Sequence, residues 1–145
     1  MEKYWGFDES KMSEGLKKSM EAFNVGYSKL NNGEYKEAIE WYSKAIEIAG
    51  VDAYYGAFDN RGIAKCAIQD YEGAIEDFQI FIRKIESNPE LNADLSNTYY
   101  NLGYSYQEIC KYNEALEAFQ KALELNPYDE DVQGKILYLK LFCIK

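Results

Sequence analysis

The chain has 145 residues, the size of one ordinary domain or of a short array of repeats, and 47% of them are hydrophobic and 28% charged. This balance is typical of globular proteins, so we do not expect a disordered chain. The 25 acidic residues outnumber the 16 basic ones and give a formal net charge of −9. Because nucleic-acid binders normally present an excess of Lys and Arg to phosphates, we expect no nucleic-acid partner.

The first residues contain no apolar run long enough for a secretory signal. The longest apolar stretch, Ile136 to Ile144, is interrupted by Lys140 and is far shorter than the roughly 20 residues that span a bilayer. We therefore expect a cytoplasmic protein with no membrane partner. The three cysteines form no C-x-x-C pair and are odd in number, which predicts reduced and mostly buried thiols rather than disulfides or a metal site.

Residues 1–18 are expected to form an N-terminal segment and the start of the first helix. An apolar stripe at helical spacing runs through Met12, Leu16, Met20, Phe23, Tyr27 and Leu30. The stripe predicts that this helix begins near Ser10 or Ser13, since both are good N-cap residues.

Three stretches then align without a gap: VGYSKLNNGEYKEAIEWYSKAIEI, RGIAKCAIQDYEGAIEDFQIFIRK and LGYSYQEICKYNEALEAFQKALEL. Each copy places Gly, Tyr, Ala and an aromatic residue at fixed spacing: Gly26, Tyr35, Ala38, Tyr42; Gly62, Tyr71, Ala74, Phe78; Gly103, Tyr112, Ala115, Phe119. Apolar residues recur every three or four positions after a turn signal, which predicts a helical hairpin in each copy. The Gly and Ala residues are expected where the two helices cross closely.

Extra residues separate the second and third copies, mostly between Glu86 and Ser96. We expect Asn88 to be an N-cap there, with Pro89 as the first helical residue. After the third copy, residues 130–145 predict one more helix, which covers the open end of the array. Its apolar residues spread around more of the helix than one packing face requires.

The repeated pattern resembles the tetratricopeptide repeat, W-x2-L-G-x2-Y, then A-x3-F, then P. The third copy matches best, through Leu102, Gly103, Tyr106, Ala115, Phe119, Ala122 and Pro127. The resemblance covers residues 19–129, as repeats at about 19–52, 55–88 and 96–129. It implies an all-α fold, a right-handed α-solenoid of antiparallel helical hairpins with seven helices in total.

The second repeat departs from the pattern. Arg61 replaces the Leu that precedes the Gly, and Lys65 replaces the aromatic residue three positions after it, as Lys29 does in the first repeat. Packing around this repeat is therefore less predictable. The acidic residues of the second helices, Asp77 among them, are expected on solvated faces rather than in an acid–base site.

In tetratricopeptide proteins the first helices of the hairpins line a concave groove that receives a peptide. The resemblance therefore implies an adaptor that binds a protein or peptide segment. The groove positions proposed for partner binding are Phe23, Tyr27, Asn60, Ile63, Asn97, Tyr100, Asn101 and Tyr104. The alternative for the aromatic residues is packing against neighbouring helices. An unliganded groove filled by the chain's own Tyr4-Trp5-Gly6-Phe7 is a further possibility.

One subfamily binds the C-terminal carboxylates of chaperones through a basic clamp of Lys, Asn, Asn, Lys and Arg. The matching positions here are Phe23, Tyr27, Asn60, Asn97 and Asn101. Only Asn60 fits the clamp, so co-chaperone function through it is not expected.

The chain contains no histidine and no glycine-rich phosphate-binding motif. We therefore expect no catalytic residues, no cofactor, no metal and no enzymatic activity. The alternative to a binding adaptor is a structural module that self-assembles as a homodimer through the apolar C-terminal helix, and we expect a monomer or a weak homodimer.

Overall fold

The computed structural model describes Ser10, residues 12–50 and residues 53–145. The segment Tyr4-Trp5-Gly6-Phe7 lies outside the described residues. Helices account for all regular structure in the described part of the chain, which contains no strand, as the repeat pattern predicts. Within that part, no helix is both long and apolar enough to cross a membrane.

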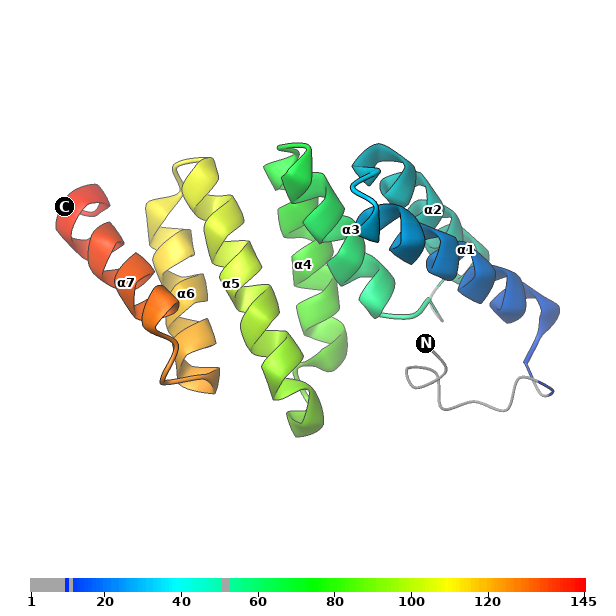
Figure 1. Ribbon diagram of the computed structural model, residues 1–145. Helices are drawn as coiled ribbons and strands as arrows, with labels where there is room; N and C mark the ends of the chain where they lie inside the picture. Colours follow the sequence, from blue (N-terminus) through cyan, green and yellow to red (C-terminus); the bar gives the residue numbers. More distant parts are fainter. Residues whose placement is uncertain (1–9, 11, 51–52) are drawn as a thin grey trace.

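Seven α-helices follow one another in the described residues as three hairpins and a final helix: α1 (Glu14–Asn31), α2 (Tyr35–Ala49), α3 (Gly56–Ala67), α4 (Tyr71–Ile85), α5 (Asn92–Glu108), α6 (Tyr112–Leu125) and α7 (Glu130–Tyr138). A 3-10 turn, η4 (Pro89–Leu91), precedes α5, and a π-helical turn, η5 (Leu139–Cys143), follows α7. Figure 1 shows the helices side by side in chain order. Each helix packs against the next, while α1 and α5 each also contact α3.

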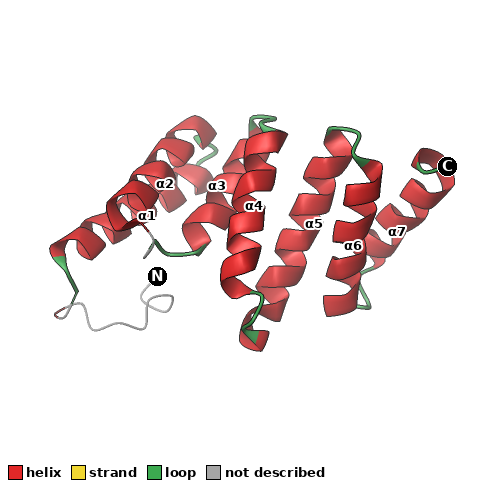
Figure 2. Ribbon diagram, turned by 180° about the vertical axis from the view of Figure 1, so that it is seen from behind, coloured by secondary structure: helices red, strands yellow, loops and turns green. Residues whose placement is uncertain are grey.

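Side-chain caps set several helix ends where the sequence predicts them. The Ser13 hydroxyl accepts a hydrogen bond from the Leu16 amide at 3.2 Å, so α1 begins at Glu14. Asn88 caps the 3-10 turn that Pro89 opens, by accepting from the Glu90 amide at 3.1 Å. The loops between the two helices of each hairpin are short, as Figure 2 shows from behind.

Close helix crossings occur where the repeated small residues lie. Ala38, Ala74 and Ala115 are fully buried. A Cβ added at Gly62 would lie 2.6 Å from the Phe78 ring, and one at Gly103 would lie 2.9 Å from the Phe119 ring. The glycine in each first helix therefore makes room for the aromatic ring of the second helix, which confirms the packing predicted from the spacing.

Asp77 is a correction to the sequence prediction, because it is only 1% exposed rather than on a solvated face. The Arg61 guanidinium donates to both of its carboxylate oxygens, at 2.6 and 2.8 Å, and the Lys65 ammonium lies 3.0 Å from Oδ2. Arg61 also donates to the Ser43 hydroxyl at 3.1 Å. The two cations that depart from the repeat pattern in α3 therefore neutralise a buried acid in α4 and link it to α2.

The thiols are less buried than predicted. Cys110 is exposed, while Cys66 and Cys143 are half-buried. Cys110 lies in the turn between α5 and α6 with a φ of 61°. A residue at such a turn has few neighbouring side chains to cover it, so the Cys110 thiol stays exposed although cysteine is usually a buried, apolar residue.

Candidate protein-binding groove

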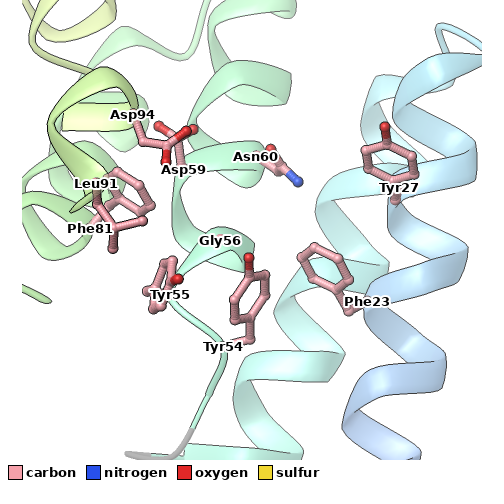
Figure 3. A pocket seen from close by; sticks show the side chains of 10 residues that line it. All are labelled: Phe23, Tyr27, Tyr54, Tyr55, Gly56, Asp59, Asn60, Phe81, Leu91 and Asp94. Atoms are coloured by element: carbon pink, nitrogen blue, oxygen red, sulfur yellow. The ribbon is translucent and has the colours of Figure 1, made fainter. Parts of the chain in front are cut away.

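The first helices of the three hairpins, α1, α3 and α5, form one face of the molecule, which we call the groove face. Two hollows of about 310 Å³ each open on it. The first hollow lies between α1, the start of α3 and the start of α5, and is lined by Phe23, Tyr27, Tyr54, Tyr55, Gly56, Asp59, Asn60, Phe81, Leu91 and Asp94 (Figure 3). The second hollow is lined by Ile63, Cys66, Phe78, Tyr100, Asn101 and Tyr104.

Aromatic rings form a continuous wall of the first hollow. Phe23 meets Tyr54 edge to face with centroids 5.1 Å apart, and Tyr54 lies 4.6 Å from Tyr55. Tyr55 in turn lies 5.9 Å from Phe81 of α4. Because each ring is held by the next, the wall is formed before any partner arrives, which lowers the entropy that binding must overcome.

Two carboxylates lie at one end of the first hollow, as Figure 3 shows. Asp59 of α3 accepts a hydrogen bond at Oδ1 from the Thr98 hydroxyl of α5 at 2.9 Å. Burial, and secondarily the neighbouring charge of Asp94, raise the pKa of Asp59 to about 6. At neutral pH this end of the hollow therefore holds a charged but poorly solvated carboxylate.

The second hollow is less polar. The Tyr104 ring meets Tyr71 at 6.1 Å between centroids, and the Tyr100 ring meets Phe119 at 5.7 Å. Burial and the nearby Asp131 raise the pKa of Tyr100 to about 12, so its hydroxyl stays neutral. Burial likewise raises the pKa of the Cys66 thiol, which lies 3.2 Å from the Ser105 hydroxyl. This thiol is therefore protonated and unreactive at neutral pH.

The residues predicted from the repeat register fall into three groups. Phe23, Tyr27 and Asn60 line the first hollow, and Ile63, Tyr100, Asn101 and Tyr104 line the second. Asn97 is exposed on α5 but lines neither. Phe23 is only 5% exposed, because its ring also packs against Tyr42 at 5.5 Å, whereas Tyr27 is 40% exposed.

Sequence reasoning missed Tyr54, Tyr55 and Asp94. All three lie in the segments between the aligned repeats, at or just before the starts of α3 and α5. The adjacent pair of tyrosines was the one available signal, since a loop seldom exposes two large aromatic side chains without a role.

Among the residues that the structure describes, no Lys or Arg lines either hollow. Among the described residues, no group of three or more Cys, Asp or Glu side chains is arranged to hold a metal ion. The groove face therefore offers aromatic surface, amides and carboxylates.

Antiparallel hairpins stacked in a row, with a hollowed face formed by their first helices, define a helical-repeat protein of the α-solenoid class. Models of the tetratricopeptide repeat match residues 22–52 and 96–129. This chain is a tetratricopeptide-repeat protein.

Two relatives illustrate the similarity. The chain is 35% identical over 130 residues to a small glutamine-rich tetratricopeptide repeat-containing protein of Dictyostelium discoideum, a match that covers 90% of this chain and 36% of that protein. It is 27% identical to serine/threonine-protein phosphatase 5 of Homo sapiens, over 88% of this chain and 24% of the phosphatase. The chain thus spans little more than a third of the first relative and about a quarter of the second.

Solved structures share the fold. The tetratricopeptide domain of Arabidopsis OM64 superposes with a TM-score of 0.75 at 21% identity, covering 87% of this chain and 97% of that one. The second tetratricopeptide domain of human RPAP3, solved with the HSP70 peptide SGPTIEEVD, gives a TM-score of 0.73 at 25% identity and covers 87% of this chain and 98% of that one.

Proposed function

We propose that the groove face binds a segment of a partner protein and that the chain acts as a protein-interaction adaptor. The observation that carries this proposal is the pair of hollows on adjoining helices, lined by aromatic and amide side chains. The peptide bound by the RPAP3 domain supports the same mode of use. We propose no enzymatic role.

The residue types suit a peptide. Tyr27 and Tyr104 supply large contact areas with few rotatable bonds. Asn60 and Asn101 each carry an amide that can donate to and accept from a peptide backbone. Tyrosine and asparagine together recognise shape and backbone, so we propose that the groove accepts an extended or helical segment.

Tyr27→Ala and Tyr104→Ala test the proposal. A partner identified by affinity capture is titrated against each variant by calorimetry, and we expect each substitution to weaken binding by about 1–2 kcal/mol or more. Glu76→Ala, an exposed residue of α4, is the control that leaves affinity unchanged. Equal affinities for all three variants, or loss with the control alone, would place the partner site elsewhere. Thermal melts of Tyr104→Ala separate a loss of contact with Tyr71 from a loss of partner contact.

The peptide SGPTIEEVD discriminates between kinds of partner. Phe23 is buried at the first clamp position, and Tyr27, Asn97 and Asn101 occupy other clamp positions without a positive charge. A C-terminal carboxylate brought to this face meets no cation among the described residues of either hollow and faces two aspartates in the first. We therefore expect this peptide to bind weakly or not at all by fluorescence anisotropy. Micromolar binding would mean that a chaperone C-terminus is the partner after all.

Self-association is the second candidate function. The observation that favours it is a group of exposed apolar side chains at the C-terminal end of the described chain, in which Leu137, Leu141 and Phe142 are 57%, 63% and 74% exposed. Exposed apolar groups of this kind mark association surfaces.

A further inference from the structure

The first hollow differs from the second in its charge. Of the described residues that line it, five are aromatic and two are carboxylates, and none of them is Lys or Arg. The charge is concentrated at one end, where Asp59 and Asp94 lie together, and Figure 3 shows the aromatic rings along the remaining walls. An occupant of this hollow therefore meets apolar ring surface along its length and negative charge at its tip.

Asp59 is only partly satisfied by the protein itself. Its Oδ1 accepts the hydrogen bond from Thr98, and within the part of the chain that the structure describes no donor is bonded to Oδ2. The neighbouring charge of Asp94 repels that of Asp59. The hollow thus contains a carboxylate with spare acceptor capacity, and none of the described residues that line it is a counter-ion.

We propose that the first hollow takes a Lys or Arg side chain of the bound partner segment. This inference rests on the proposed function of the groove face and adds the chemistry that the groove selects. The aliphatic stem lies along the rings of Tyr54 and Tyr55, and the cationic head reaches Asp59 and Asp94. Aromatic faces attract a cation in addition to the carboxylates.

Partial burial explains why a cation is preferred over a neutral side chain. An ion pair in a poorly solvated hollow is stronger than one in bulk water. Asp59 has already lost much of its hydration, so pairing with a cation recovers interaction energy that a neutral side chain cannot supply. Arg matches the spare carboxylate oxygen with a planar fork of donors, whereas Lys offers a point charge.

A favourable position at the start of a helix does not by itself explain why residue 59 is an aspartate. A carboxylate in the first turn of α3 benefits from the helix dipole, and Asp94 in the first turn of α5 does so as well. An Asn at position 59 would accept the Thr98 hydrogen bond equally well without the penalty of a desolvated charge. The charge itself is therefore the feature that a ligand explains.

Selection from a library of random 12-residue peptides, displayed on phage and captured on the immobilised full chain, tests the inference. We expect enriched peptides to share a Lys or Arg at one position. Each enriched peptide is then synthesised with that residue replaced by norleucine for Lys or citrulline for Arg, and titrated by calorimetry. We expect affinity to fall by about tenfold or more, which is the usual size of a charge-assisted hydrogen bond.

Two protein variants assign the contact. In the double variant Asp59→Asn, Asp94→Asn the original and neutral peptides should bind with similar affinity, whereas the matched exposed variant Glu76→Gln should keep the preference. Enrichment of neutral or acidic peptides, or a preference for the basic residue that survives the double variant, overturns the cation site while peptide binding at the groove stands. A library from which the chain enriches no peptide overturns both.

Discussion

Partial burial raises the pKa of Asp59 from its ordinary value of 3.8 to about 6, so at neutral pH the folded protein holds a charge that the unfolded chain would solvate better. Because the pKa of Asp59 is higher in the folded chain than in the unfolded chain, protonation of Asp59 favours the folded state. This contribution to the free energy of unfolding is fully present below pH 3.8, where the group is protonated in both states. It is lost as the pH rises through 6. Above that pH the charge lowers the free energy of unfolding by at most about 3 kcal/mol, and by less where solvent reaches it.

Asp59→Asn should therefore stabilise the protein at pH 7.5, by about 1–2 kcal/mol, because the amide keeps the Thr98 hydrogen bond and removes the charge. Most of the gain should disappear at pH 4, where the folded wild type has lost the charge as well. Urea unfolding of both proteins at the two pH values measures the effect. If Asp59→Asn stabilised the protein equally at both pH values, the charge of Asp59 would not be the cause.

Backbone conformation at the hairpin turns is a second feature of single residues. Gly33, Gln69 and Cys110 occupy equivalent positions, seven residues after the repeat glycine, and have φ values of 77°, 66° and 61°. A side chain in this left-handed region costs about 1 kcal/mol relative to glycine. The first repeat therefore has the residue that the turn favours, and the other two repeats are strained there.

Cys110→Gly and Gln69→Gly should each raise the free energy of unfolding by about 0.5–1 kcal/mol in urea titrations. Cys110→Ala is the matched control, because alanine removes the thiol but keeps the Cβ that causes the strain. If Cys110→Ala gained as much as Cys110→Gly, the sulfur and not the backbone would be responsible.

The positions of individual site residues were predictable where the repeat register applies. The register fixes which side of a helix each residue faces, and the resemblance to tetratricopeptide repeats implies which side forms the groove, so Tyr27, Asn60 and Tyr104 could be assigned to the groove face. Tyr54 and Asp94 lie between the aligned segments, where no register applies. The contact of Phe23 with Tyr54, which adds to its contact with Tyr42, could not be predicted either, because Tyr54 lies outside the register.

At the scale of helices, α3 and α4 use a charged cluster where the third repeat uses apolar packing. The cluster residues Arg61, Lys65 and Asp77 correspond to Leu102, Tyr106 and Ala118 in the third repeat. Asp77 is buried and forms ion pairs with both cations. The second repeat thus has a buried ion cluster where the third repeat has an apolar contact. The departures in α3 and the acid in α4 belong to this one exchange, whereas sequence reasoning treated them as separate features.

Asp77→Ala alone should destabilise the protein by about 3 kcal/mol, since it leaves Arg61 and Lys65 without their buried partner. Arg61→Leu alone should cost less, because Lys65 still pairs with Asp77. The triple variant Arg61→Leu, Lys65→Tyr, Asp77→Ala copies the third repeat and should recover most of that loss. Urea unfolding of the three variants measures the coupling. Losses that simply add across the substitutions would show that the three charges act independently.

The start of a helix or helical turn was predictable where an N-cap residue marks it. Ser13, Asn88 and Asp129 each accept a backbone amide hydrogen bond at the start of their helix or turn. The 3-10 form of the turn before α5 and the π-helical form of the end after α7 were not predicted, because a cap residue marks where a helical turn begins and not which helical form it takes.

For the whole molecule, the two ends of the array matter most, since each repeat is covered only by its neighbours. At the C-terminal end of the described chain, α7 and η5 bury Val132, Ile136 and Leu139 in a cluster with Phe119 of α6. The last helix therefore covers the core of the third repeat. Leu141 and Phe142 remain on the outside of this cover.

Leu141→Glu tests what these exposed residues do. We expect the wild-type chain to be a monomer or a weak dimer, because the exposed group is small compared with the interface that a stable dimer needs. Sedimentation velocity over a concentration series should show a small rise in mean mass for the wild type, and Leu141→Glu should abolish that rise. Its free energy of unfolding should change by less than about 0.5 kcal/mol, because the side chain is 63% exposed.

Lys140→Glu, at the exposed neighbouring residue, makes the surface more negative by two charges rather than one and keeps the apolar side chains, so it should leave the residual association in place. If instead the wild type sediments as a dimer at every concentration and Leu141→Glu converts it to a monomer, the C-terminal surface is an obligate interface. Self-assembly would then be the main role of the chain. The groove faces of two such chains would be held at a fixed distance, and peptide binding would have to be measured on the dimer, with linked sites in place of independent ones.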